Sequence, residues 1–209
     1  MIIYRFVSDL LLSNMYLLEE EGHALVIDPC RNIEPGEGLQ IDKVLLTHEH
    51  YDHISGVNVW KKAYHARVLC SEACAKNIEN PKKNMVRYFD VFCEMQNWVK
   101  LDEIPDVDLQ YICTAEETFA DEMTFKWQGH TIRMFALPGH SQGSAGILVD
   151  NCEFFSGDSF MEHGPVELRF PGGSAKAWKK ISVPRLAMLP DGLRIHPGHF
   201  EEFIFRKGG

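Results

Sequence analysis

The sequence predicts an α/β fold, and three observations support that prediction. Short apolar runs rich in β-branched and aromatic residues are mixed along the chain with segments of helical pattern. The apolar share of 45% and the charged share of 24% are those of an ordinary globular protein. A chain of 209 residues is long enough for a two-layer core but short of two full domains, so we expect one domain over residues 1–209.

The elements follow in chain order from these patterns. Strands are expected at residues 2–7, 15–18, 24–27, 44–46, 131–137, 145–149, 153–155 and 193–195, and several of them end at a turn or a polar group. Helices are expected at 52–62 with Asp52 as N-cap, at 71–78 with Ser71 as N-cap, and at about 174–188, interrupted or ended near Pro184. Because strands and helices are mixed, we expect helices to cover the sheet faces. Residues 80–121 are interpreted as a connector or lid beside the site, with the aromatics at 88, 89 and 92 in the core.

Charge and composition exclude several classes of function. The net charge of −9, with no run of lysines or arginines, argues against nucleic-acid binding. No segment approaches the roughly 20 apolar residues of a membrane helix, and the N-terminal apolar stretch is too short for a signal peptide. The six cysteines are scattered without a CxxC pair, so we expect reduced thiols in a cytoplasmic protein.

A cluster of metal-ligand residues lies directly after the expected strand at 44–46. The sequence HEHYDH at 48–53 places three imidazoles and a carboxylate within six positions. In an extended backbone, side chains at i and i+2 point the same way, so His48 and His50 can bind one ion. Asp52 and His53, at the start of the following helix, face elsewhere and suit a second ion. Zinc, iron and manganese all accept these nitrogen and oxygen ligands.

Three further turns each present one ligand-type residue at an expected strand end. His140 lies in LPGHS at 137–141, Asp158 in SGDS at 156–159, and His199 in HPGH at 196–199. Each turn alone is more often structural than functional. Together with the cluster at 48–53 they complete a set of seven, which is what a two-metal site requires.

These motifs resemble those of the metallo-β-lactamase superfamily, over essentially the whole chain. HxHxDH at 48–53, PGH at 138–140, GD at 157–158 and PGH at 197–199 occur in the family's order, and Asp28 in VIDP at 26–29 resembles its first motif. The resemblance implies a four-layer αββα sandwich with the metals at one edge. It implies that the first metal is bound by His48, His50 and His140, that the second is bound by Asp52, His53 and His199, and that Asp158 bridges both.

Within that superfamily the chain is most similar to short glyoxalase II-like thioester hydrolases. PGGS at 171–174, IS at 181–182 and LPD at 189–191 are similar to the C-terminal half of that group. Phe200 and Cys30 stand where the group has glycine, and residues 167–170 replace its Gly-Arg-Thr-Asp stretch. The chain ends ten residues after His199, so we expect no counterpart of the C-terminal helical domain that helps to bind glutathione. These departures concern glutathione recognition and not the metal site.

We therefore expect a binuclear metal-dependent hydrolase that cleaves a thioester or related ester through a hydroxide bridging two divalent ions. Two such ions lower the pKa of a shared water toward neutrality. Asp52 is the expected catalytic residue, because it would orient that hydroxide. Zinc is the expected metal, with iron or manganese as alternatives, and the expected partner is a small-molecule substrate. A lactonase, a single-iron persulfide dioxygenase and a non-catalytic metal-binding protein are the competing hypotheses, and the oligomeric state is left open.

Residues that flank the motifs provide the remaining candidates. Asp28 is expected to hydrogen-bond a ligand histidine or a loop amide. His163, five residues after Asp158, and Arg169 are candidates for binding the substrate. Cys30 lies near the expected metals and is interpreted as an inert thiol, with a metal ligand or an oxidation target as the alternatives.

Overall fold

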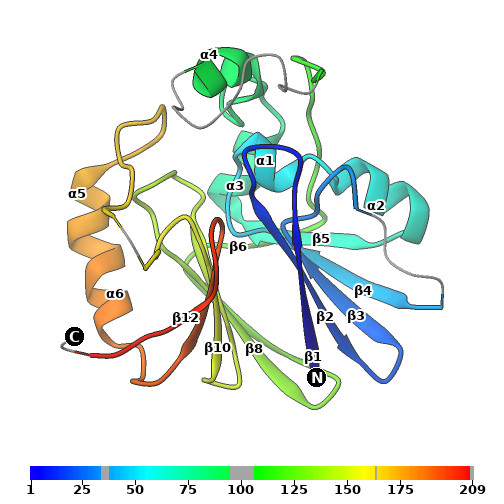
Figure 1. Ribbon diagram of the computed structural model, residues 1–209, viewed down its shortest axis with the longest axis vertical. Helices are drawn as coiled ribbons and strands as arrows, with labels where there is room; N and C mark the ends of the chain where they lie inside the picture. The colour runs from blue at the N-terminus through cyan, green and yellow to red at the C-terminus, as the bar shows by residue number, and fades with distance from the viewer. Residues whose placement is uncertain (34–37, 95–105, 163, 208–209) are drawn as a thin grey trace.

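The computed structural model describes residues 1–33, 38–94, 106–162 and 164–207, and its framework is a pair of mixed six-stranded sheets packed face to face (Figure 1). The first sheet has the order β1 (Ile2–Val7), β2 (Asn14–Glu20), β3 (His23–Ile27), β4 (Gln40–Leu45), β5 (Arg67–Ser71) and β6 (Glu117–Phe119). The second has the order β12 (Phe203–Ile204), β11 (Arg194–Pro197), β10 (Glu153–Gly157), β9 (Ala145–Val149), β8 (His130–Ala136) and β7 (Glu122–Trp127).

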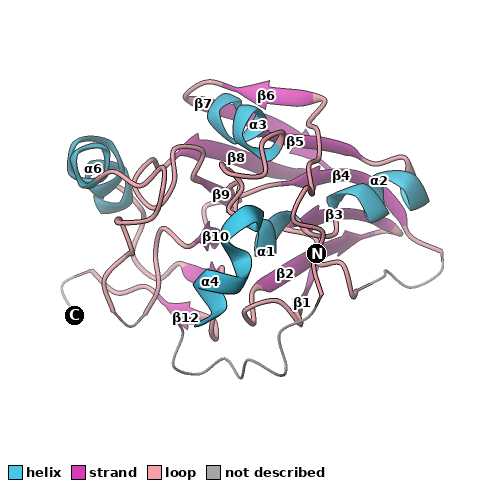
Figure 2. Ribbon diagram, turned by 90° about the horizontal axis from the view of Figure 1, so that it is seen from above, coloured by secondary structure: helices cyan, strands magenta, loops and turns pink. Residues whose placement is uncertain are grey.

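Helices cover the outer face of each sheet and the edge where both sheets end. Their bounds are α1 (Tyr51–Ile54), α2 (Val57–Tyr64), α3 (Glu72–Ile78), the 3-10 turn η1 (Val86–Tyr88), α4 (Phe89–Glu94), α5 (Ala175–Ala177), the π-helical η3 (Trp178–Ser182) and α6 (Val183–Ala187). Helices α2 and α3 pack on the first sheet, and the run from α5 to α6 packs on the second (Figure 1). Helices α1 and α4 lie at the shared edge (Figure 2).

Strand alternation explains the four layers. In β3, Leu25 and Ile27 face the second sheet, whereas Ala24 and Val26 face α2 and α3. Successive side chains of a strand point to opposite faces, so a strand buried on both faces is apolar throughout. The second sheet follows the same rule, because Phe155 of β10 packs between the sheets while its neighbour Phe154 packs under the α5–α6 run. The predicted αββα sandwich is confirmed.

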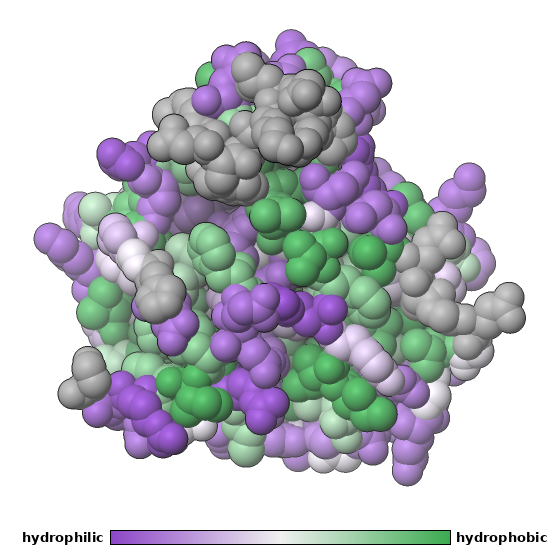
Figure 3. All heavy atoms as spheres, in the orientation of Figure 1, coloured by the Kyte–Doolittle hydropathy of each residue, from purple (hydrophilic) through white to green (hydrophobic). Residues whose placement is uncertain are grey.

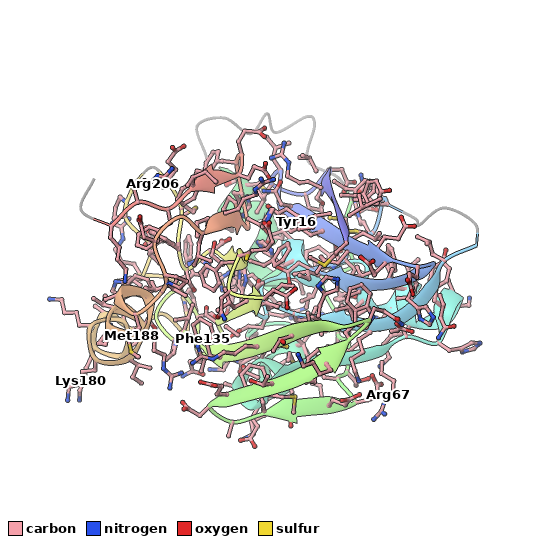
Figure 4. All side chains as sticks on the ribbon, turned by 90° about the horizontal axis from the view of Figure 1, so that it is seen from below. Tyr16, Arg67, Phe135, Lys180, Met188 and Arg206 are labelled. Atoms are coloured by element: carbon pink, nitrogen blue, oxygen red, sulfur yellow. The ribbon has the colours of Figure 1, made fainter. Side chains whose placement is uncertain are left out.

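The two sheets are also joined by polar contacts. Tyr16 of β2 points from the first sheet toward the second (Figure 4) and donates its hydroxyl to the carbonyl of Pro197, 2.7 Å away. Asn14 donates to the same carbonyl from 2.9 Å. Both contacts place the end of β11 against β2, at the edge that carries the loops with PGH and HxHxDH.

The structure extends the strand prediction and corrects one helix. Every expected strand overlaps an observed one, but β5, β6, β7 and β12 were not predicted. The predicted helix at 52–62 is wrong as one element, because it breaks at Ser55–Gly56 into α1 and α2. A Cβ on Gly56 would lie 2.4 Å from the carbonyl oxygen of Cys30, so the chain crosses closely there. The helix expected at 174–188 is interrupted near Pro184, as predicted, because the π-helical η3 ends at Ser182 and α6 begins at Val183; the helical run continues past Pro184 to Ala187.

The connector predicted at 80–121 carries more regular structure than expected. It contains η1, α4 and β6, and the last of these completes the first sheet. Residues 95–105 of it lie outside the described part of the chain. Over the described ranges, no helix is long and apolar enough to cross a membrane.

Candidate metal centre

Four loops at one edge of the sandwich bring the seven predicted ligand residues together. The loop after β4 carries His48 and His50 and leads into α1, which carries Asp52 and His53. The loops after β8, β10 and β11 supply one residue each: His140, Asp158 and His199. All seven side chains are buried or half-buried.

The first group consists of His48, His50 and His140. One ring nitrogen of each lies within 4.8 Å of one nitrogen of the others. Nε2 of His140 is 3.0 Å from Nδ1 of His50, and these rings meet edge to face. Three imidazole nitrogens converging on one point are the ligand set of a zinc-type site.

The second group consists of Asp52, His53 and His199, whose ligand-type atoms also lie within 4.8 Å of one another. Oδ2 of Asp52 is 3.3 Å from Nε2 of His53 and 3.4 Å from Nε2 of His199. This set of two imidazoles and one carboxylate likewise suits a divalent transition metal.

Asp158 lies between the two groups. Its Oδ2 is 3.3 Å from Nε2 of His140 in the first group and 3.6 Å from Nε2 of His199 in the second. Its Oδ1 is 3.5 Å from Nε2 of His53. One carboxylate therefore faces both groups, as the bridging role implied by the family resemblance requires.

Buried polar atoms test whether these residues fit metal ions. Among the described residues, Nε2 of His48 and Oδ1 of Asp158 are buried without a hydrogen-bond partner, although they face the cluster. Nε2 of His50 is also buried and unpaired, while its Nδ1 faces His140. Buried polar atoms without a partner are costly and rare in native proteins. Bound cations would satisfy the two atoms that face the cluster, so the residues fit such ions.

Electrostatics favour the neutral, metal-binding forms of two histidines in the first group. Burial, together with the neighbouring His140, lowers the pKa of His50 to about 3. Burial and the nearby His53 and His50 lower the pKa of His48 well below its ordinary value. Both rings are therefore neutral at physiological pH and keep a lone pair for a cation.

In the second group the carboxylates and imidazoles stabilise each other's charges. Burial raises the pKa of Asp52, but the adjacent His53 and His199 outweigh it and lower that pKa well below its ordinary value. Burial opposes the charged form of His53, yet Asp52 and Asp158 raise the pKa of His53 well above its ordinary value. Such a cluster of ionised carboxylates concentrates negative charge where a cation would replace the protons.

Asp28, which follows β3, holds the ligand loop after β4 from behind the cluster. Its Oδ2 is 3.1 Å from Nδ1 of His53, and its Oδ1 accepts the backbone N–H of Thr47 from 2.8 Å. The Thr47 hydroxyl donates to Asp28 and lies 3.1 Å from Nδ1 of His48. A partner on the rear nitrogen of an imidazole fixes its orientation and leaves Nε2 for the metal. The contacts of Asp28 with a histidine and a loop amide are those expected from the sequence.

Two supporting residues were not anticipated. Glu49 is buried between the ligand histidines of the HxH motif, and it accepts Nδ2 of Asn77 at 2.7 Å and the Ser141 hydroxyl at 2.8 Å. The backbone carbonyl of Glu167 lies 2.9 Å from Nδ1 of His140. No local pattern signals either role, because the partners are 27 to 92 residues away in the chain.

The remaining candidates have different surroundings. The side chain of Arg169 is 89% exposed and pairs with Glu167 on the surface, so its predicted contact with substrate stays a prediction. His163 lies outside the described residues. Cys30 is buried, and burial raises the pKa of its thiol to about 12, which supports an inert thiol.

A cavity of about 270 Å³ opens onto the cluster. Its lining consists of Leu11, His50, Tyr51, Asp52, Met85, Phe89, His140, Asp158, Met161, Glu167, Phe170, His199 and Phe200. Phe89, expected only in the core, is buried against Tyr51 and also forms part of this wall. A small molecule in the cavity would contact both groups of the cluster.

Comparisons with known proteins agree with this geometry. The chain is 28% identical over 192 residues to a hydroxyacylglutathione hydrolase of Aeromonas hydrophila. The matched region covers 88% of this chain and 60% of that protein, so the chain spans about three fifths of the relative's length. It is 25% identical over 184 residues to the probable polyketide biosynthesis zinc-dependent hydrolase BaeB of Bacillus velezensis, covering 84% and 67%. The solved structure of TTHA1623 in a di-iron-bound form superimposes with a TM-score of 0.70 at 24% identity, covering 96% and 94%, and shows a shared fold.

The family model of the metallo-beta-lactamase superfamily matches residues 8–199, which include all seven residues of the cluster. That match spans most of the chain, and the αββα sandwich and the cluster at its edge agree with it. The chain belongs to the metallo-beta-lactamase superfamily.

Proposed function

We propose that the protein is a binuclear metal-dependent hydrolase that cleaves a thioester or related ester. The observation that carries the proposal is the position of Asp158, whose carboxylate faces two separate groups of ligand-type atoms across 3.3 to 3.6 Å. A carboxylate in that position is suited to hold two cations side by side. The resemblance to glyoxalase II-like proteins and the similarity to a hydroxyacylglutathione hydrolase support the thioester class.

The protein's own residues have distinct tasks in this proposal. His48, His50 and His140 would hold one cation, Asp52, His53 and His199 the other, and Asp158 both. Divalent cations bound there would supply Lewis-acid activation of water and of a carbonyl group. Asp52 lines the cavity and is deprotonated, so it can orient the attacking water by accepting its hydrogen bond. Asp28 and Thr47 keep His53 and His48 aligned.

The experiment combines metal analysis with a substrate panel. Elemental analysis of the purified protein is expected to find two equivalents of metal, zinc in the first place, with iron or manganese as the other candidates. Assays then compare acyl-glutathione thioesters, simple aryl esters, lactones and glutathione persulfide. Thioester or ester cleavage supports the proposal. Oxygen uptake with glutathione persulfide and no cleavage would reject it in favour of a dioxygenase, and lactone cleavage alone in favour of a lactonase.

Variants connect activity to the cluster. Asp158→Asn keeps the shape of the side chain and removes its charge, and it should reduce both bound metal and turnover. His65→Asn is a matched control, because His65 lies at the end of α2 outside the cluster and its left-handed backbone (φ 53°) is one that asparagine tolerates. Full metal content and full activity in Asp158→Asn would contradict the bridging role.

A further inference from the structure

The wall of the cavity around the cluster is mainly apolar. Leu11, Met85, Phe89, Met161, Phe170 and Phe200 contribute to it, from segments far apart in the chain. The Phe170 ring lies edge-on to His50 and His140, at 6.1 and 5.8 Å between centroids. Apolar side chains therefore reach the position where a reacting carbonyl would lie.

Three of these wall residues adopt a backbone conformation that bulky side chains rarely adopt. The φ angles are +53° at Leu11, +69° at Met85 and +68° at Phe200. Left-handed backbone is unfavourable for a bulky residue and is easily adopted by glycine. Such strain persists only where the surroundings enforce it, and it gathers at functional sites. The sequence thus keeps three large apolar side chains where glycine would be less strained.

Buried or partly buried polar contacts hold the backbone at or beside each of these positions. The Phe200 carbonyl accepts Nδ2 of Asn14 at 2.7 Å. The turn at Leu11 is closed by Ser13, whose hydroxyl donates to the Asp52 carbonyl at 2.8 Å. Asn84 is fully buried beside Met85. Its Oδ1 accepts the backbone N–H of Val86 at 3.1 Å, and its Nδ2 donates to the Tyr111 carbonyl at 2.9 Å.

The exposure of Phe200 points to a ligand. Phe200 is 71% exposed, although it adjoins His199 and lines the cavity, whereas Leu11 is buried and Met85 is half-buried. Apolar surface also gathers near the turn between β1 and β2 (Figure 3), where Leu12 is 56% exposed. An exposed aromatic ring held in a strained conformation gains little from packing in the free protein, so its benefit comes from binding.

The charges of the wall determine which ligand it suits. Within the described part of the chain, the residues that line the cavity include carboxylates and imidazoles but no lysine or arginine. Glu167 lines the cavity, and the neighbouring Arg169 is engaged with the Glu167 carboxylate on the exposed side. A substrate tail that carries carboxylates would find no cationic partner among these residues, whereas an uncharged apolar chain would bury its surface against the wall.

We infer that the cavity is an acyl-binding pocket and that the substrate is an ester or thioester with an uncharged apolar acyl chain, held by Leu11, Met85 and Phe200. This inference rests on the proposed hydrolase function. It differs from that function in naming the group that is recognised and the residues that recognise it.

The first test measures binding without catalysis. The uncharged fluorescent probe N-phenyl-1-naphthylamine is titrated into the metal-loaded wild type, Phe200→Gly and Met85→Gly, with Gln128→Gly as control. Gln128 also has a positive φ, of 44°, but lies in the β7–β8 turn outside the cavity lining, so its variant relaxes backbone strain alone. We expect Kd to rise about tenfold in Phe200→Gly and Met85→Gly, as loss of half a large apolar contact would produce, and not in the control. Equal Kd values in all four proteins would overturn the inference.

The second test measures chain-length preference. Acetyl, butanoyl and hexanoyl thioesters of N-acetylcysteamine are compared with lactoylglutathione in the wild type and in Phe200→Gly. In the wild type we expect kcat/KM to rise up to about fourfold per added methylene, because KM falls as the acyl chain lengthens. In Phe200→Gly the increase per methylene should be smaller. Flat dependence, or preference for lactoylglutathione, would overturn the inference and leave the hydrolase proposal intact. No cleavage of any substrate would refute the hydrolase proposal, and the probe titration would still decide whether the wall binds apolar ligands.

Discussion

Glu49 provides the sharpest test of how the ligand loops are held. Its buried carboxylate accepts three hydrogen bonds, from Nδ2 of Asn77 at 2.7 Å, the Ser141 hydroxyl at 2.8 Å and the Gly143 N–H at 3.3 Å. These contacts tie the HxH loop to α3 and to the loop that carries His140. Replacing the carboxylate therefore perturbs the support of the first metal group without removing a proposed ligand.

The expected magnitude follows from what each substitution leaves unpaired. In Glu49→Ala, Ser141 can turn to Ser144, 2.9 Å away, but the Asn77 and Gly143 donors stay buried without an acceptor. At roughly 1–3 kcal/mol for each stranded donor, the loss of unfolding free energy is about 4 kcal/mol. Glu49→Gln keeps one carbonyl oxygen for both donors, so its loss is about 1 kcal/mol.

Urea denaturation of the metal-free protein measures both losses. With a slope of about 2 kcal/mol/M for a chain of this size, Glu49→Ala should lower the midpoint by about 2 M and Glu49→Gln by about 0.5 M. Metal titration of the same proteins should show weaker binding in Glu49→Ala. A midpoint for Glu49→Ala within about 0.5 M of the wild type, or identical midpoints for the two variants, would refute this account.

Three further predictions follow from the same structure. Gly56→Ala should destabilise the protein by about 2 kcal/mol, because the added Cβ would lie 2.4 Å from the Cys30 carbonyl oxygen; an unchanged urea midpoint would contradict that close approach. A thiol reagent should modify Cys152 rapidly and the five buried cysteines only on unfolding, as mass spectrometry of the native protein would show; fast labelling of Cys30 would contradict its burial. Removal of bound metal by a chelator should lower the melting temperature measured by calorimetry by about 5–10 °C, as expected for a ligand present at 100 times its Kd. Asp158→Asn should abolish that difference, and an undiminished difference in the variant would place the metal elsewhere.

Local sequence determined most of the framework and the ligand set. Strands buried on both faces, such as β3 and β9, are apolar runs that any reader of the chain can identify. The ligand motifs are local as well, because a histidine or aspartate placed soon after a strand is positioned at the sheet edge where that strand ends. Edge strand β7 was missed for the converse reason: its charged and half-exposed residues form no apolar run.

Tertiary structure alone decided how the site is supported and shaped. The sequence identifies Asp158 as a ligand-type residue, but only folding places it between the two groups. Glu49 has no recognisable role until Asn77 and Ser141 reach it from other loops. The apolar wall is likewise assembled from residues far apart in the chain, such as Leu11 and Phe200. Periodicity reports which face of an element is buried, whereas contacts between loops depend on long-range packing that no local pattern encodes.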